Sequence, residues 1–269
     1  MPCLGVIGNI SIDTTRYPDG RRHVLIGGAA LYVASAAARA GATTRPISVA
    51  GSDLASLHAH AWPATLDLSG VAMLPGPSCR FDITYGSDGQ VIAMTAEYGA
   101  ATTLTAHALT LLARSGFDHW HVCCRRPLDV GQVLDRLMMT GQRFSLDFHL
   151  ASAAEQITAA KAALPHAEAV FVNAAEYQLL DELVAVNDLP AVVVSDGPGA
   201  VILLRHGQPV GVELPERHPV VEVTGAGDTL AGTFLAEFLH GIPGRDALAA
   251  AVTAASRHTG TPGVPYNPP

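Results

Sequence analysis

The sequence predicts an α/β protein, built as a three-layer α/β/α sandwich with a mostly parallel sheet and a small β lid. From about residue 105 onward, short apolar runs alternate with longer stretches of helical pattern, the order that builds a parallel sheet covered by helices. Hydrophobic residues make up 49% and charged residues 15% of the 269 residues, so the chain can bury a large core and is not disordered. A hairpin pattern well inside the chain predicts the lid.

A helix is the clearest element of the first fifty residues. Gly27 and Gly28 precede an Ala-rich stretch, Ala29 to Ala40, and Gly41 follows it. Because Ala is the strongest helix former and Gly is favoured just past a helix end, this stretch predicts a helix. An apolar run predicts a strand on either side of this helix, and a stretch rich in Arg and Asp predicts a polar connection. The pattern from Asp53 to Pro77 is weak and gives no prediction. The strands are Leu4 to Ile10 and Thr44 to Ala50, and the polar connection is Thr15 to His23.

The stretch Arg80 to Tyr98 has the pattern of a β-hairpin. Apolar and polar residues alternate in its first half, Asp88-Gly89 follow, and a second run comes after them. An Asp-Gly pair between two such runs is typical of a tight hairpin turn. In a chain of otherwise α/β pattern this hairpin is an insertion. We therefore expect one domain over residues 1–269, with a lid formed by segments near 11–26 and 79–98.

The rest of the chain alternates between strands and helices, and two helices close it. Apolar runs predict strands at Trp120 to Cys124, Phe144 to Asp147, Ala169 to Val172 and Ala191 to Ser195. Helices are predicted at Thr105 to Arg114, Asp129 to Thr140, Ser152 to Leu164 and Ala174 to Leu183. A hairpin, Ala200 to Leu204 with Pro209 to Glu213, precedes the closing helices at about Gly227 to His240 and Arg245 to Arg257.

Composition narrows the range of functions. The net charge of −8 argues against a nucleic-acid partner, because phosphate binding depends on basic residues. No run reaches 18 apolar residues, so we expect no membrane span. The first residues lack the pattern of a secretory signal, so we expect a cytoplasmic protein with its four cysteines reduced.

The most informative segment is the turn Gly225-Ala226-Gly227, with Asp228 directly after it. Leu230, Phe234 and Phe238 recur every four residues, which predicts a helix that begins at this turn. The backbone N–H groups at a helix start and the helix dipole together favour anions, and glycines let a phosphate approach the backbone. A carboxylate beside a bound phosphoryl group suits a general base. The plainer alternative is that Asp228 is an ordinary first-turn residue behind a glycine cap.

This turn belongs to a longer motif that resembles the C-terminal signature of the ribokinase (PfkB-type) family of sugar and nucleoside kinases, Asp-Thr-x-Gly-Ala-Gly-Asp. Here the residues from Glu222 to Asp228 read Glu-Val-Thr-Gly-Ala-Gly-Asp. The resemblance implies a ribokinase-like fold and an ATP-dependent reaction in which Asp228 deprotonates the accepting hydroxyl. It also implies that the amides of Gly225, Ala226 and Gly227 form the anion hole for the transferred phosphoryl group and that Thr224 contacts the nucleotide.

Two N-terminal motifs resemble the part of the family that binds the acceptor. Gly8-Asn9-Ile10-Ser11-Ile12-Asp13 is similar to the family's first strand, and Gly27 to Ala34 are similar to its Gly-Gly-x-x-x-Asn-x-Ala signature. The resemblance implies that Ser11, Asp13, Gly27, Gly28 and Tyr32 bind the acceptor. A buried carboxylate that accepts two hydroxyl hydrogen bonds discriminates strongly for polyols. Tyr32 stands where the family has Asn, so we expect an aromatic wall there.

The nucleotide side also carries family motifs. Asn173 and Glu176 match an Asn-x-x-Glu motif that acts through water on the Mg²⁺ bridging the ATP phosphates, although a helix cap is the alternative for the same quartet. Ser195 and Gly197 follow a strand that, by resemblance, borders the nucleotide. Glu222 replaces the Asp that helps hold a monovalent cation in several members, so a need for K⁺ stays open.

We therefore predict a kinase that moves the γ-phosphate of ATP to a hydroxyl of a small polyol: a sugar, a nucleoside or a cyclitol. Arg125, with Arg80 at the foot of the lid, suits a phosphate or carboxylate on the acceptor, so a kinase for a sugar phosphate or sugar acid is an alternative. A non-catalytic nucleotide-binding regulator is another. The fingerprints of Rossmann dehydrogenases and P-loop kinases are both missing from the sequence. Phe81, Ile83 and Tyr85 in the lid leave open a homodimer formed through it.

Overall fold

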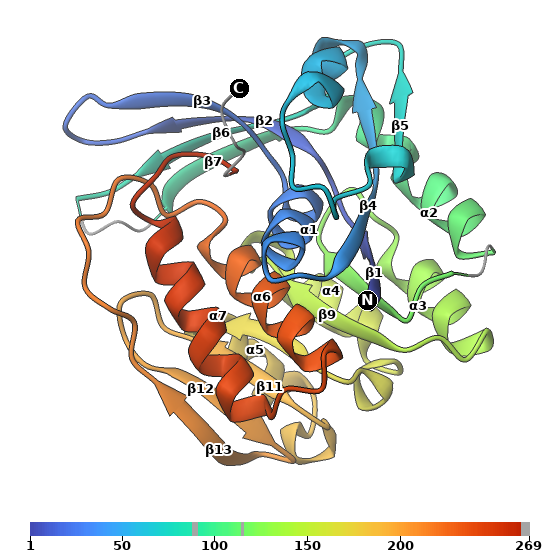
Figure 1. Ribbon diagram of the computed structural model, residues 1–269, viewed down its shortest axis with the longest axis vertical. Coiled ribbons are helices and arrows are strands. Elements are labelled where there is room, and N and C mark those ends of the chain that lie inside the picture. The colour runs from blue at the N-terminus through green and yellow to red at the C-terminus, as the bar shows by residue number, and fades with distance from the viewer. Residues whose placement is uncertain (88–90, 114–115, 265–269) are drawn as a thin grey trace.

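The chain forms a large sheet with helices on both faces and a smaller sheet at one end (Figure 1). The computed structural model describes residues 1–87, 91–113 and 116–264. The large sheet has the order β13-β12-β11-β10-β9-β8-β1-β4-β5, in which β11 to β5 are parallel and β12 and β13 form an antiparallel edge. Its strands are β1 (Cys3–Ile7), β4 (Thr43–Gly51), β5 (Val71–Leu74), β8 (His119–Cys124), β9 (Phe144–Phe148), β10 (Val170–Asn173), β11 (Val192–Ser195), β12 (Val201–Arg205) and β13 (Gln208–Glu213).

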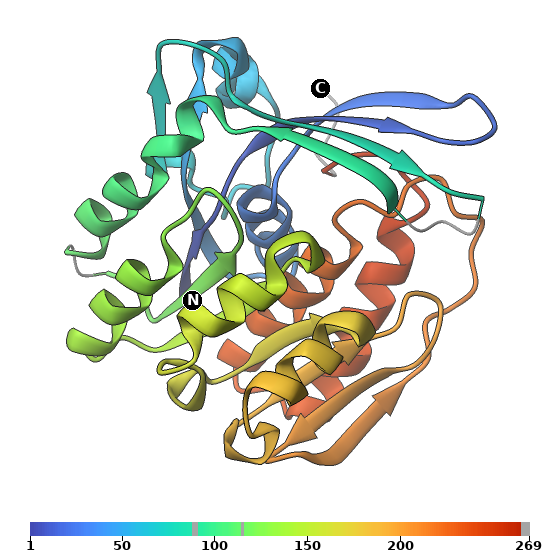
Figure 2. The same ribbon diagram turned by 180° about the vertical axis from the view of Figure 1, so that it is seen from behind.

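Helices cover both faces of this sheet, as the two views show (Figures 1 and 2). One face packs against α1 (Ala29–Arg39), α6 (Ala226–Leu239) and α7 (Gly244–His258), and the other against α2 (Leu104–Leu112), α3 (Val130–Met139), α4 (Ala153–Ala160) and α5 (Ala174–Leu183). Side chains that follow one another on β1 join different cores: Val6 packs with the first group of helices and Ile7 with the second. The predicted three layers are therefore present.

The smaller sheet is formed by the two segments predicted as a lid, and it is called the lid below. It has the order β3-β2-β6-β7 and consists of β2 (Ser11–Arg16), β3 (Arg22–Gly27), β6 (Cys79–Tyr85) and β7 (Val91–Glu97). In both views it extends away from the large sheet (Figures 1 and 2). Short 3-10 helices connect several elements, at Ser52–Ala59, Leu68–Gly70, Gly99–Thr103, Leu150–Ser152, Leu164–His166 and Val186–Asp188.

The structure corrects two predictions in the N-terminal segment. The predicted strand from Leu4 to Ile10 ends at Ile7, and the predicted polar connection from Thr15 to His23 is a hairpin of β2 and β3. The inward residues of β2 are polar, Ser11, Asp13 and Thr15, so the strand lacks the apolar alternation that marks a half-buried strand.

Other boundaries differ less. The hairpin of β6 and β7 is confirmed, although its predicted turn at Asp88-Gly89 lies outside the described residues. The predicted helix from Ser152 to Leu164 is shorter, since α4 ends at Ala160 and a 3-10 turn with Pro165 follows. The end predicted at Arg114 also lies outside the described residues. Among the described helices, none combines the length and the apolar character that a membrane crossing needs.

Candidate active site

The carboxyl ends of four neighbouring strands carry the polar residues of the candidate site. Arg125 follows β8, Asp147 lies near the end of β9, and Asn173 and Ser195 end β10 and β11 as register partners. In open parallel sheets, ligands bind in the crevice beyond this edge. The order of the strands therefore brings together residues that lie far apart in the sequence.

A cavity of about 440 Å³ lies between this edge and the lid. Its lid wall is largely apolar and aromatic and includes Phe81, Ile83, Tyr85, Met94 and Tyr98. The predicted site residues in its lining are Ser11, Asp13, Gly28, Tyr32, Arg125, Thr224, Gly225 and Asp228. The other predicted residues, Gly27, Asn173, Glu176, Ser195, Gly197, Ala226 and Gly227, are not among the described residues that line it.

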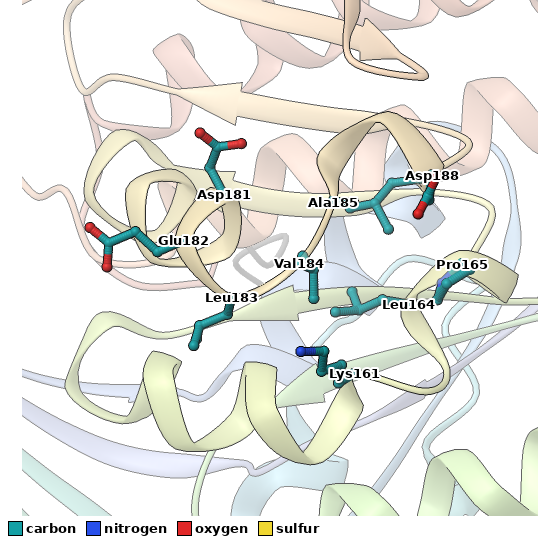
Figure 3. Close-up of a pocket in the computed structure, with 10 residues that line it drawn as sticks. Lys161, Leu164, Pro165, Asp181, Glu182, Leu183, Val184, Ala185 and Asp188 are labelled. Carbon is teal, nitrogen blue, oxygen red and sulfur yellow. The ribbon is translucent and has the colours of Figure 1, made fainter.

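A second hollow of about 500 Å³ lies elsewhere, between α4, α5 and the 3-10 turns that follow them (Figure 3). It contains Lys161, the sole lysine of the chain, together with the carboxylates of Asp181, Glu182 and Asp188. None of the predicted site residues lines it. Of the two hollows, only the cavity under the lid is therefore lined by predicted site residues.

The glycine turn begins α6 as the sequence predicts. Gly225 is its N-cap, with a φ of 82°, and a Cβ there would lie 2.4 Å from Cδ1 of Tyr32, so only glycine fits. A Cβ on Gly227 would meet no described atom within 4 Å outside its own turn and helix backbone. The amide of Ala226 donates to the Val223 carbonyl at 3.2 Å, so this amide of the predicted anion hole already has a partner within the turn.

Asp228 lies at the start of α6 and lines the cavity, with 14% of its side chain exposed. Its Oδ1 is 3.2 Å from Nη2 of Arg125, and the same nitrogen is 2.5 Å from Oδ2 of Asp147. Burial raises the pKa of Asp228, the neighbouring Asp147 adds to the rise, and Arg125 opposes it. Burial alone would also raise the pKa of Asp147, but Arg125 and His121 outweigh burial and hold it below its usual range.

The two arginines predicted to recognise an anionic acceptor are engaged by carboxylates. Arg125 lines the cavity but contacts both Asp147 and Asp228, whereas Arg80 lies 2.5 Å from Oδ2 of Asp53 and does not line the cavity. The structure therefore does not bring Arg80 to the cavity that Arg125 lines. Asp147 was missed from the sequence, because nothing in the local pattern indicates a contact between residues 22 positions apart.

The residues predicted to bind the acceptor are grouped around Asp13. This carboxyl is 3% exposed and accepts a hydrogen bond from Oγ of Ser11 at 2.7 Å, and burial raises its pKa to about 7. A Cβ on Gly27 would lie 2.3 Å from Oδ2 of Asp13, and a Cβ on Gly28 would lie 2.4 Å from the Asn9 carbonyl. Gly27 thus makes room for the carboxyl group, and Gly28 makes room for the backbone at Asn9. Tyr32 is 2% exposed and lines the cavity, which agrees with the expected aromatic wall.

Glu222 joins the lid to the glycine turn. Its fully buried carboxylate accepts hydrogen bonds from Thr15 Oγ1 at 2.7 Å, Tyr17 OH at 2.6 Å and Thr224 Oγ1 at 2.8 Å. The backbone amides of Val223 and Thr224 also donate to it, each at 3.1 Å. Burial would raise the pKa of Glu222, but these donors hold it below its usual value. Both carboxylate oxygens are therefore already occupied by donors of the protein.

The two roles predicted for Asn173 and Glu176, a helix cap and the binding of Mg²⁺ through water, do not exclude each other. The pair forms a capping box at the start of α5: Glu176 N donates to Asn173 Oδ1 at 2.9 Å, and Asn173 N donates to Glu176 Oε2 at 2.8 Å. Glu176 is 4% exposed, and burial raises its pKa to about 7. Such a buried carboxyl group would be stabilised as the anion by a nearby cation, which fits a hydrated Mg²⁺. Ser195 lies beside Asn173, and Gly197 follows with a φ of 51°.

The lid side chains that left a homodimer open face the cavity. Phe81, Ile83 and Tyr85 all line it, and Tyr85 OH lies 2.7 Å from Thr224 Oγ1. On the lid, the more exposed apolar side chains are Val24 at 56% and Ile92 at 67%. The apolar alternation of β6 therefore coincides with the wall of the cavity.

Comparisons with known proteins agree with this architecture. The model of the pfkB family carbohydrate kinases matches residues 4–268. The cytidine kinase of Thermococcus kodakarensis is 32% identical over 255 residues, which cover 89% of this chain and 90% of that protein.

Solved structures give the same result for the fold. A nucleoside kinase from Burkholderia thailandensis in complex with inosine has a TM-score of 0.79 and 19% identity, covering 96% of this chain and 91% of that one. Ribokinase from Cryptococcus neoformans in complex with ADP has a TM-score of 0.75 and 20% identity, covering 98% of this chain and 95% of that one. The predicted α/β/α fold is thereby confirmed.

Proposed function

Because the chain belongs to the pfkB family of carbohydrate kinases, and so is an ATP-dependent small-molecule kinase, we propose that it phosphorylates a hydroxyl of a nucleoside. The observation that carries this choice is the two-ended cavity. Asp13 lies at its polar end, and aromatic lid side chains such as Phe81 and Tyr98 form its apolar wall. A ribose and a flat base need such surroundings, and about 440 Å³ is within the usual size of small-molecule sites. The activity printed for the T. kodakarensis relative, cytidine kinase, supports the same class.

The proposed reaction uses the residues where α6 begins. Asp228 takes the proton of the attacking hydroxyl, since it is a carboxylate of raised pKa that lines the cavity. The N-terminus of α6 at Gly225 and Gly227 stabilises the negative charge of the transferred phosphoryl group. Ser11, Asp13, Gly27, Gly28 and Tyr32 form the acceptor end. On the nucleotide side we assign Thr224, Ser195 and Gly197, which lie at the glycine turn and after β11.

The residues of the site fit Mg²⁺ but do not fit K⁺. Asn173 and Glu176 would hold Mg²⁺ through water, and the ion would neutralise charge on the nucleotide phosphates. The residues do not fit a K⁺ site at Glu222, because its carboxylate oxygens accept hydrogen bonds from Thr15, Tyr17 and Thr224. We therefore propose that the reaction does not need K⁺.

The two sheets would act as one catalytic domain over residues 1–269, with a lid that excludes water during transfer. The bonds from Thr15 and Tyr17 to Glu222 connect lid position to the anion-binding turn. A homodimer formed through the lid would have the exposed side chains of Val24 and Ile92 available for contact. We do not extend the proposal to anionic acceptors, because Arg80 is paired outside the cavity and Arg125 is held by two carboxylates.

The test is a panel of nucleosides, sugars, cyclitols and sugar phosphates, assayed for acceptor-dependent release of ADP. We expect the highest kcat/KM with a nucleoside, with the reaction lacking acceptor as control. A sugar phosphate or a free sugar turned over with a higher kcat/KM than every nucleoside would contradict the proposed acceptor class. It would leave the kinase assignment intact.

A further inference from the structure

We propose that Asp147 is a positioning residue for the base: it holds the Arg125 guanidinium so that Asp228 shares this cation without being neutralised by it. The inference rests on the proposed role of Asp228 as the base. Neither Asp147 nor a pairing role for Arg125 was indicated by the sequence.

One nitrogen atom is divided between two carboxylates. Nη2 of Arg125 is 2.5 Å from Oδ2 of Asp147 but 3.2 Å from Oδ1 of Asp228, so Asp147 is the closer partner. The side chain of Arg125 is 16% exposed, that of Asp147 is 7% exposed and that of Asp228 is 14% exposed. In such partly desolvated surroundings, charge interactions are stronger than at the surface. Among the described residues, Nε of Arg125 has no hydrogen-bond partner. The guanidinium is therefore held mainly by the two carboxylates.

Asp147 is built on a rigid element. It lies within β9, beside its register partner Cys123 on β8, in the centre of the large sheet. Nε2 of His121 lies 3.9 Å from Oδ2 of Asp147, the same oxygen that contacts Arg125. A group fixed on a central strand can hold Arg125 more precisely than a loop residue could.

The charges around Asp228 explain why this division matters. The ionisable groups that face it come from several elements: Arg125, His121 and Cys123 from β8 and its end, Asp147 from β9, Asp13 from β2 and Tyr32 from α1. With Arg125 ionised and both nearby carboxyl groups deprotonated, the cluster of Arg125, Asp147 and Asp228 carries one net negative charge. If Asp147 lost its charge, Arg125 would pair with Asp228 alone. That pairing would lower the proton affinity of the base and draw its carboxylate toward the arginine.

A purely structural ion pair and a positioning residue predict different pH profiles. In single-turnover reactions, Asp147→Asn should move the acid limb of the rate to lower pH by about one unit or more, because a neighbouring negative charge is lost. Arg125→Met should move the limb to higher pH, because the cation is lost. Asp147→Glu keeps the charge and should leave the limb close to that of the wild type. A structural role alone predicts lower rates with no displacement of the limb in opposite directions.

The matched control is Glu168→Gln. Glu168 Oε1 lies 2.7 Å from Nε of Arg143. The substitution therefore removes one negative charge from an arginine pair, as Asp147→Asn does, but outside the site. We expect the acid limb of this variant to stay in place. Thermal melting of each variant checks that it is folded.

Two further variants keep the inference testable. If Asp147→Asn does not fold, the double variant Asp147→Asn/Arg125→Met replaces both charges, which buried sites tolerate better than the loss of one. Its acid limb should lie below that of Arg125→Met, because one neighbouring carboxylate is gone. Limbs that move in the same direction in both single variants, or a double variant whose limb stays with that of Arg125→Met, would overturn the inference. Asp228→Asn is a separate test: if it kept its transfer rate, the proposed base itself would be wrong.

Discussion

The variant Gly227→Ala tests whether the space in front of α6 belongs to the transferred phosphoryl group. Gly227 is the second residue of the helix, and a Cβ there would meet no described atom within 4 Å outside its own turn and helix backbone. The protein therefore accepts the methyl group without strain. Because Ala is the better helix former, we expect stability to stay the same or rise by up to about 1 kcal/mol.

The catalytic effect should be opposite in sign. The methyl group would stand where the backbone has to approach the phosphoryl group, and loss of one such contact costs about 10²–10³ in kcat, which is about 3–4 kcal/mol in the transition state. Initial rates with saturating ATP and acceptor give kcat, and thermal melting gives stability. We expect KM for the acceptor to change less than kcat.

Gly131→Ala is the matched control. Gly131 is the second residue of α3, and its Cβ would meet only Oδ1 of Asp129 at 3.6 Å, an ordinary contact. Both variants should be equally stable, and only Gly227→Ala should lose activity. If Gly227→Ala kept the kcat of the wild type, the turn would not lie against the phosphoryl group and the reasoning would be refuted.

Three other predictions follow from the same site. Gly225→Ala should lower the free energy of unfolding by about 2 kcal/mol or more, measured by urea denaturation, because the residue has a φ of 82° and its Cβ would lie 2.4 Å from Tyr32; an unchanged midpoint would contradict this. Turnover should be the same in KCl and in choline chloride at equal ionic strength, because the carboxylate oxygens of Glu222 already accept hydrogen bonds from the protein. A dependence of turnover on K⁺ would contradict this prediction. The Kd for the nucleoside, measured by calorimetry, should fall from pH 6 to pH 8. Asp13 has a pKa of about 7 and, in the proposed role, accepts hydroxyl hydrogen bonds as the carboxylate. Asp13→Asn should bind the nucleoside without this pH dependence, and equal pH profiles of the two proteins would refute the prediction.

The start of α6 was predictable from the sequence because its signals are local. Apolar residues recur every four positions after the turn, and a glycine marks the N-cap at Gly225. The same holds for α1, whose Ala-rich run lies between glycines, and for the hairpin of β6 and β7, whose alternation is regular. These elements depend on neighbours within a few residues.

The lid strand β2 could not be recognised in this way. Its buried face carries Ser11 and Asp13, which line the cavity, and Thr15, which donates to Glu222, so this face does not join an apolar core. A strand whose inward residues are polar reads as a connection. A lid segment was expected near residues 11–26, but the residue pattern there indicates a polar connection and no strand.

The cluster around Asp228 could not be predicted from the sequence for another reason. Arg125 contacts Asp147 and Asp228, which lie 22 and 103 positions away, and only the order of the strands brings them together. The sequence suggested an acceptor role for Arg125 because an arginine suits a phosphate or carboxylate on the acceptor. Electrostatic pairing over such separations becomes visible only in three dimensions.

The most direct test of the account compares Asp228→Asn with the wild type in two measurements, phosphoryl transfer in a single turnover and the Kd for ATP by calorimetry. We expect transfer to slow by about 10²–10⁴-fold, the usual contribution of a general base, while ATP binds as before. Transfer at the rate of the wild type would contradict the account, because the hydroxyl would then lose its proton without this carboxylate.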